Sequence, residues 1–381
     1  MFWLYWNRWR PAVLAASLSL ACIAAIVIAA GSVVGGYEPA TAGKAGTGRT
    51  GTQARHPPLS ANSVQARRGV LLMRAAAIAC QNVAYRGVQM VAWWGPAGGS
   101  TSLIQVWHRS GGPELAKETG DSDPGSDPAE PPQDATGKVA SGVLSVPPWM
   151  LSLMRANYEI SYVGPGSASD RPAHVVAVRR GNGTLAAQYW LDASTNLPLR
   201  REVFDSGEHL VNEGAFIDLH IGDRDVDAVP AAGVRPWSAR SVAHSLAALR
   251  AQGWSLPASL AGDLALVGVT RTMTPSGWVV DASYSDGLSV VSVFTQRGEL
   301  EGALPGWHLA AVQGKQVYSA QPEERSFAWS AGGLVYTVLA DAPPDTVQRV
   351  VVELPHQERA GFWQRVSSGL RRMVSWLNPF G

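Results

Sequence analysis

Charged side chains are crowded in one stretch of the chain, Tyr189–Gly222, where aspartate, glutamate, histidine and arginine follow one another closely. Carboxylates and imidazoles that converge in a pocket can act as general acids and bases. Here, however, the polar clusters Asp192–Asn196 and Asp205–Gly207 separate short apolar runs. Asp, Asn and Gly in such positions are typical of turns between antiparallel strands. We therefore expect a β-meander whose charges mainly face solvent, with a catalytic cluster as the alternative.

Sequence motifs that would support catalysis or metal binding are absent. The chain has no G-x-S-x-G, H-E-x-x-H, Walker A or C-x-x-C pattern. Gly181–Ala186 matches G-x-G-x-x-A, but a strand pattern follows it, whereas dinucleotide binding requires a helix there. His174 and His220 have no His or Cys at metal-ligand spacing, so we interpret both as strand-face histidines. The sequence therefore predicts no catalytic residue, no metal and no cofactor.

The N-terminal part has no charged residue between Arg10 and Glu38. An apolar run of this length is sufficient to cross a hydrocarbon core of roughly 30 Å as a helix. Arginines precede the run, so the positive-inside rule places the N-terminus in the cytoplasm and the bulk of the chain outside. We expect a single-pass anchor in the cell membrane, with a cleaved signal peptide as the alternative. Cys80 is then the only cysteine of the exported part, and its apolar surroundings predict a buried, unreactive thiol.

In the rest of the chain, short apolar runs are separated by turn residues, a pattern that predicts two mainly antiparallel sheets. With 381 residues and a net charge of +1, it has room for about two domains and no overall bias toward nucleic acid. A helix is expected from about Ala61 to Gln81, followed by paired strands. A hairpin that turns at Asn182-Gly183 leads into the meander. After a linker rich in proline and alanine, a second set of paired strands begins near Leu264, and residues 343–355 predict a closing helix.

Two segments differ in composition from the predicted sheets. Gly111–Gly137 is rich in acidic residues and proline, which predicts a disordered or loosely held insertion, with a metal-binding loop as the alternative. The final segment predicts a basic amphipathic helix that contacts the membrane surface or a partner groove, or else docks on its own domain. Its candidate contact residues are Phe362, Trp363, Arg365, Arg371, Arg372 and Trp376.

Tryptophan is prominent in the predicted strands, and the whole chain has 15 such residues, which raises the question of what these rings contact. Core packing is the default, but a sheet curved around a helix can also enclose an apolar pocket. Successive side chains of a strand point to opposite faces, so only one of Trp93 and Trp94 can face such a pocket. The candidate ligand-binding residues are Trp93, Trp94, Trp107 and Trp190.

Several stretches, in order along the chain, resemble the RseB/MucB family of extracytoplasmic regulators of sigma factors. They include NVAYRGVQMVAWW, IQVWH, MRANYEISYVG, YWLDASTNLPLRREVFDSG and YSDGLSVVSVF, within a region from about Ala61 to Leu354. The resemblance implies an α+β fold with a large domain similar to the lipoprotein carriers LolA and LolB. That domain would be an open antiparallel β-sheet wrapped on helices over an apolar cavity, and a smaller α+β domain would follow. The resemblance also implies binding to the extracytoplasmic segment of a transmembrane anti-sigma factor, relieved by lipid-like molecules.

The expected function is therefore a membrane-anchored, non-enzymatic regulator of an envelope-stress sigma factor that senses a lipid-like ligand. A lipid or lipoprotein carrier is the alternative, although a carrier needs only the large domain. The anchor, the acidic insertion and the C-terminal helix depart from the family pattern. The expected organisation is a cytoplasmic stub and anchor at 1–37, a flexible linker at 38–60, a large domain at 61–225 with its insertion at 111–137, a linker and helix at 226–262, a small domain at 263–355 and the basic helix at 356–381.

Overall fold

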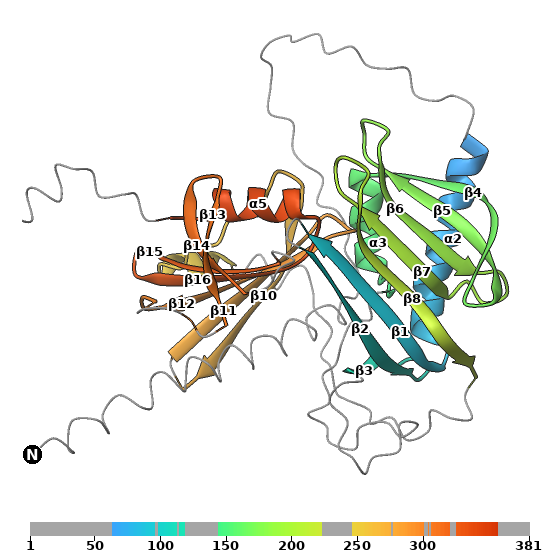
Figure 1. Ribbon diagram of the computed structural model, residues 1–381, viewed down its shortest axis with the longest axis horizontal. Coiled ribbons are helices and arrows are strands. Elements are labelled where there is room, and N and C mark those ends of the chain that lie inside the picture. Colours follow the sequence, from blue (N-terminus) through green and yellow to red (C-terminus); the bar gives the residue numbers. More distant parts are fainter. Residues whose placement is uncertain are drawn as a thin grey trace, which may run out of the picture.

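The computed structural model describes residues 63–95, 98–112, 114–118, 144–222, 246–275, 277–300, 304, 306–320 and 325–356. These residues form two antiparallel sheets of eight strands each, which lie side by side (Figure 1). We call the first sheet and its helices α2 and α3 the first domain. The second sheet and helix α5 are the second domain. This arrangement confirms the mainly antiparallel α+β architecture expected from the sequence.

The first domain begins with a long helix and ends with the predicted meander. Its strand order is β3-β2-β1-β8-β7-β6-β5-β4, so the last strand, β8, returns to pair with β1. The predicted hairpin turn is present between β5 and β6, where Gly183 has φ +88°. The elements are α2 (Ser63–Asn82), β1 (Tyr85–Gly95), β2 (Gly98–His108), β3 (Glu114–Glu118), α3 (Pro148–Asn157), β4 (Glu159–Ala168), β5 (Arg171–Arg179), β6 (Leu185–Asp192), β7 (Pro198–Phe204) and β8 (Leu210–Ile221).

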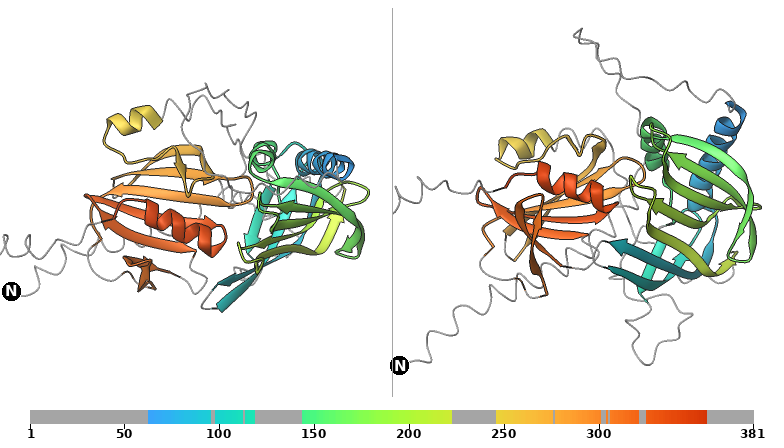
Figure 2. Two further views of the ribbon diagram at one scale, coloured as in Figure 1. Left: turned by 90° about the horizontal axis from the view of Figure 1, so that it is seen from above. Right: turned by 45° about the horizontal axis from the view of Figure 1, so that its top comes forward.

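Helices α2 and α3 lie side by side over one face of the first sheet (Figure 2). Glycine sets the close approach of α2 to β4, because a Cβ on Gly69 would lie 2.7 Å from the backbone carbonyl carbon of Ser161. Alternate residues of the strands face the helices, as the period of two in a strand requires. The buried apolar cluster between helices and sheet includes Met73, Ala76, Ala77, Leu151, Met154, Val176, Val178, Ala187, Tyr189, Leu191 and Val203.

The second domain is a curved sheet closed by one helix. Its strand order is β13-β14-β15-β16-β12-β11-β10-β9, and residues 246–251 add a helical segment before the sheet. The apolar side of α5 packs on the sheet through Val347, Val350 and Val351, all fully buried. The elements are β9 (Ser259–Leu260), β10 (Leu264–Thr274), β11 (Gly277–Ser285), β12 (Val290–Arg297), β13 (His308–Val312), β14 (Lys315–Ser319), β15 (Ser326–Ala331), β16 (Leu334–Asp341) and α5 (Pro344–Glu353).

The acidic insertion requires a correction at its start. The sequence predicted a disordered segment for 111–137, but Glu114–Glu118 forms β3 and pairs with β2. Leu115 and Ala116 are buried there, and the Tyr85 hydroxyl donates a hydrogen bond to Glu114. The average composition of the insertion concealed this short apolar dipeptide, whose burial stabilises an added edge strand. The rest of the insertion, from residue 119 onward, lies outside the described residues.

Three expected features cannot be compared with the structure. The anchor at 1–37 and the linker at 38–60 lie outside the described residues. The same holds for the basic C-terminal helix beyond His356, and thus for Phe362, Trp363, Arg365, Arg371, Arg372 and Trp376. Within the part of the chain that the structure describes, no helix combines the length and apolar character needed to cross a membrane.

Candidate partner-binding junction between the two domains

The turn between β11 and β12 is built by its own polar side chains. The Asp286 carboxylate accepts hydrogen bonds from the backbone amides of Leu288 and Ser289, at 2.8 and 2.7 Å. The Ser285 hydroxyl accepts one from the Gly287 amide and donates one to the Ser289 carbonyl oxygen. Gly287 has φ +98°, a conformation that L side chains rarely adopt. Asp, Gly and Ser in this order therefore fix a rigid turn, which we call the plug (Asp286–Ser289).

The plug of the second domain inserts into the core of the first domain. Leu288 is only 2% exposed and belongs to the same apolar cluster as Met154 of α3 and Tyr189 of β6. The backbone of the plug touches α3 directly, because a Cβ on Gly287 would lie 2.1 Å from the Met154 backbone nitrogen. Burying one leucine side chain stabilises such a contact by about 2 kcal/mol. Leu288 is thus a core residue of the first domain, although the turn that carries it belongs to the second domain.

Polar side chains of the first domain surround the plug. The Tyr158 hydroxyl donates to Asp286 Oδ2 at 2.7 Å, and the Asn157 side-chain amide donates to the Asp286 carbonyl oxygen at 2.9 Å. From β7, the buried Arg201 guanidinium donates to the Leu288 carbonyl oxygen at 2.6 Å. Arg201 also lies 3.7 Å from Asp341 of β16. The plug is therefore held by an apolar anchor and by donors from α3, its C-terminal flank and β7.

Burial alters the titration of the two groups that meet at the plug. Removal from water raises the pKa of Asp286, while the amides of Ser289 and Leu288 and the Tyr158 hydroxyl act in the opposite direction. Burial and the adjacent Asp286 raise the pKa of Tyr158 far above its usual range. The tyrosine thus keeps its proton and stays a hydrogen-bond donor. This arrangement holds two domains together, and it presents no nucleophile paired with a base.

Two cavities lie near or within the second domain. One, of about 210 Å³, lies at the junction and is lined by both domains, including Tyr158, Arg180, Asp286 and Arg349. Pockets for drug-sized ligands are usually about 300–1,000 Å³, so this one suits a small polar group or one side chain of a partner. The other, of about 660 Å³, is lined by residues of β13, β14 and β15 and by His356.

The four candidate tryptophans do not gather in one place. Trp93 is buried against the second domain, where the Arg325 guanidinium lies 4.0 Å from its ring centre. Trp94 points to the other face and is 40% exposed, as strand alternation predicts. Trp107 is buried, and the Trp190 ring lies 4.9 Å from Arg200. None of the four lines either cavity described above, so an apolar ligand pocket formed by these rings stays a prediction.

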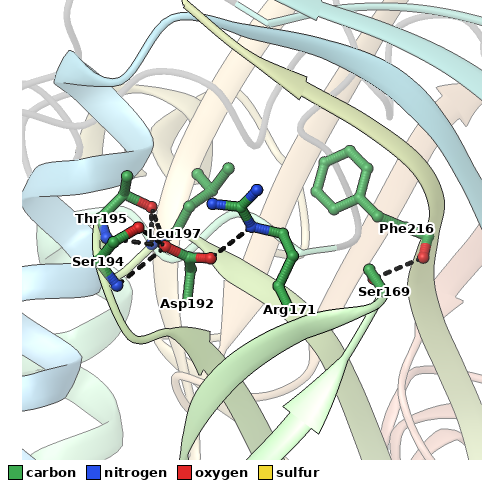
Figure 3. Close-up of polar contacts among 7 residues, drawn as sticks. All are labelled: Ser169, Arg171, Asp192, Ser194, Thr195, Leu197 and Phe216. Atoms are coloured by element: carbon green, nitrogen blue, oxygen red, sulfur yellow. Dashed lines mark hydrogen bonds and ion pairs between the residues drawn. The ribbon is translucent and has the colours of Figure 1, made fainter.

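The charged stretch Tyr189–Gly222 forms strands of the first sheet, as the meander interpretation predicted, but not all of its charges face solvent, because Asp192 and Arg201 are buried. Asp192 is buried at the end of β6, where it accepts hydrogen bonds from Ser194, Thr195 and Arg171 (Figure 3). Burial alone would raise the pKa of Asp192, but these donors outweigh it and hold the pKa below its usual range. Its carboxylate therefore stabilises the β6–β7 turn. Within the described residues, no group of three or more His, Cys, Asp or Glu side chains is arranged to hold a metal ion.

Comparison with known protein families supplies the deciding observation. Residues 133–238 match the family model of the MucB/RseB N-terminal domain. Over this segment the chain is MucB/RseB-like. The matched residues include Tyr158 and Arg201, which receive the plug. The second domain lies outside the matched segment.

Solved structures give more distant similarities. The complex of Pseudomonas aeruginosa MucA and MucB is 19% identical, with a TM-score of 0.42, and the match covers 76% of this chain and 100% of that one. A structure of MucB with MucA(peri) matches with the same values. A LolA superfamily protein from Nitrosomonas europaea is 9% identical, with a TM-score of 0.18, and the match covers 75% of this chain and 97% of that one. Similarities of this size carry no argument about function. A search of the curated proteins gave no match.

The plug was not predicted as a site, although its residues were quoted in YSDGLSVVSVF for the MucB/RseB resemblance. A turn signal in a sequence indicates a solvent-exposed hairpin, and only the leucine at its tip departs from that pattern. Leu288 within S-D-G-L-S was the available signal, because an apolar side chain at a tight turn needs a surface to cover it.

Replacing Arg201 with methionine is expected to lower the free energy of unfolding by about 2 kcal/mol, since a buried hydrogen bond from a charged donor is lost. Urea denaturation followed by circular dichroism measures the change. Arg179→Met is the matched control, because the hydrogen bond from Arg179 to the Gly183 carbonyl oxygen is exposed to solvent. Loss of such an exposed contact should cost at most about 1 kcal/mol. Equal losses in the two variants would contradict the role given to Arg201.

Proposed function

We propose that the protein is an extracytoplasmic, non-enzymatic regulator that binds the extracytoplasmic segment of a transmembrane anti-sigma factor. The observation that carries this proposal is the match of residues 133–238 to the MucB/RseB N-terminal domain. MucB itself has been solved with the periplasmic part of MucA. In this proposal, binding of the anti-sigma factor tunes an envelope-stress sigma factor, and a lipid-like molecule relieves that binding.

The junction is the part of the molecule best suited to such a partner. A segment that contacts both domains binds well only when the domains keep one relative position, because a preorganised surface avoids part of the ordering cost. The plug supplies that fixed position through Leu288, Tyr158 and Arg201. A carrier of lipid or lipoprotein is the second candidate, but a carrier has no need for a second domain anchored in the core of the first.

Co-purification of the full chain from detergent-extracted membranes tests the proposal. Chemical cross-linking before extraction and mass spectrometry of the captured proteins should identify a single-pass membrane protein with an anti-sigma domain. Lipid extraction from the same sample tests the second candidate. A stoichiometric lipid or lipoprotein with no such membrane partner would replace the regulator by the carrier.

We further propose that residues 11–37 stay attached to the mature protein and anchor it in the cell membrane. The charge-free run between Arg10 and Glu38 supports this placement, as do the arginines before it. Mass spectrometry of the membrane-extracted protein should find peptides from residues 1–10. A mature N-terminus after Ala30 would show that the run is a cleaved signal. The basic segment at 356–381 would then be a candidate for membrane contact in its place.

A further inference from the structure

The outward face of α2 carries a line of exposed apolar side chains. Val64, Leu71 and Ile78 are 73, 62 and 59% exposed. They recur every seven residues, close to two helical turns, so they lie on one side of the helix over roughly 20 Å. Single exposed apolar residues are normal on protein surfaces. A line of three along one helix is a feature that a partner can recognise.

Basic side chains accompany this line. Arg67, Arg68 and Arg74 are exposed on the same helix, and α2 contains no aspartate or glutamate. Arg68 lies over the Tyr162 ring, 3.8 Å from its centre. Arg67 and Arg74 form no ion pair with any residue that the structure describes. The outward face of α2 is therefore apolar and positively charged, with no acidic side chain on the helix to offset the charge.

The helix cannot rotate to hide this face. Met73, Ala76 and Ala77 are buried on the opposite side of α2. Gly69 brings the helix against the backbone of β4, where even a methyl group would collide with Ser161. Both views in Figure 2 show α2 on the outside of the first domain, beside α3. The fold therefore presents Val64, Leu71 and Ile78 permanently.

We propose that the outward face of α2 docks on an anionic lipid surface. A helix with apolar side chains on one line and arginines beside it has the chemistry of a helix lying in a membrane interface. A partner helix fits less well, since a helix–helix seam needs two apolar positions per heptad. The line of exposed residues supplies only one apolar position per heptad. The positions three or four residues after Val64, and three after Leu71, are arginines: Arg67, Arg68 and Arg74. This inference rests on the membrane-proximal placement proposed above, although it does not depend on the anti-sigma partner.

Docking through α2 orients the first domain. The charge-free run ends at Tyr37 and α2 begins at Ser63, so only a short tether separates the proposed anchor from the helix. In this proposal residues 38–62 act as a flexible linker, and a flexible chain of that length would span on the order of 30 Å, which would let α2 reach the surface into which the anchor inserts. The first domain would then lie with its helices toward the lipid and its sheet away from it.

The test reports the position of α2 in the full chain, reconstituted into liposomes. A fluorophore is attached to Leu71→Cys in a Cys22→Ser background, where Cys80 is buried. Lipids with a quenching nitroxide report contact with the bilayer. We expect strong quenching with phosphatidylglycerol liposomes, little with phosphatidylcholine liposomes, and a loss of quenching at high salt. Met273→Cys is the matched label, because Met273 is also 62% exposed but lies in the second domain.

Charge variants separate docking from anchoring. The double variant Arg67→Gln/Arg74→Gln should lower the ratio of docked to free helix about fivefold per arginine, or about 25-fold in total. Arg271→Gln/Arg297→Gln removes the same charge from exposed positions of the second domain and should leave the ratio unchanged. Recovery of the chain with phosphatidylcholine liposomes reports the anchor, independently of the quenching. Equal quenching at positions 71 and 273 in both lipids would overturn the inference. The inference would also be overturned if the label at position 71 were shielded only when a protein partner is added. The outward face of α2 would then dock in a groove of that protein.

Discussion

Replacing Gly287 with alanine is expected to detach the plug from the first domain. The new Cβ would lie 2.1 Å from the Met154 nitrogen, 2.6 Å from its Cα and 2.7 Å from the Met150 carbonyl oxygen. All three are backbone atoms of α3, so no side-chain movement can relieve the collision. The turn must withdraw, which removes the burial of Leu288 and the hydrogen bonds from Tyr158 and Arg201. Together these contacts contribute on the order of 5 kcal/mol to the coupling of the domains.

Small-angle scattering and calorimetry measure this uncoupling. We expect Gly287→Ala to increase the radius of gyration and to split thermal unfolding into two independent transitions, with both sheets still folded. Gly277→Ala is the matched control, because Gly277 also has a positive φ, +116°, but nothing lies within 4 Å of its added Cβ. That variant should lower the free energy of unfolding of the second domain alone, by about 1–2 kcal/mol. An unchanged radius for Gly287→Ala would disprove the plug as the fixed point between the domains. The same variant should lose any partner that spans both domains.

The second large effect concerns Asp281 of β11, a buried carboxyl group in the second sheet. It is only 5% exposed, and its Oδ1 atom has no hydrogen-bond partner. Burial raises the pKa of Asp281 from 3.8 to about 7. An acid whose pKa is raised by folding stabilises the fold while it is protonated. This stabilisation is complete below about pH 4 and is lost as the pH rises through about 7. The loss is on the order of 4 kcal/mol at pH 8.

Asp281→Asn should remove this pH dependence, because the amide is uncharged at every pH. The variant is expected to match the wild type near pH 4 and to be more stable by a few kcal/mol at pH 8, as measured by urea denaturation across that range. Asp170→Asn is the control, since Asp170 is exposed in a turn with φ +56°, a conformation that asparagine adopts readily. Its pH profile should follow the wild type. A parallel shift of the Asp281→Asn profile, with the same slope, would show that folding does not change the pKa of Asp281.

The sequence predicts those parts of the fold that depend on neighbours along the chain. The meander from β5 to β8 follows from Asn182-Gly183 and Asp192–Asn196, because these residues favour turns by bonding their own backbone. The opposite facing of Trp93 and Trp94 follows from the period of a strand, and the structure confirms it. The same local signals cannot reveal which distant surface covers an apolar turn residue. Leu288 is buried by α3, more than 100 residues earlier, and only the folded chain brings the two together.

The residues of the candidate site could not be predicted for the same reason, because their contacts join segments that are far apart in the sequence. Tyr158, Arg201 and Asp286 had ordinary positions at the end of a helix, in a strand and in a turn. Their partnership depends on the relative placement of two domains, which no single-sequence pattern encodes. Trp93 was one of the candidate residues of an apolar pocket, and the structure places the Arg325 guanidinium of the second domain 4.0 Å from its ring centre. Sequence reasoning identified a residue that matters for the structure, but it could not identify what that residue contacts.

The burial of Leu288 in the first domain also sets an order of events when the chain is made. A ribosome adds about 5–20 residues per second, so Leu288 emerges roughly 3–13 s after Gly222, where the strands of the first domain end. A first domain that folds as it emerges is complete in its strands but lacks one side chain of its core. The place beside Met154 and Tyr189 is open until the β11–β12 turn arrives. During that interval the equivalent turn of a second copy fits the same place, so slow synthesis of the second domain favours an intertwined, domain-swapped dimer.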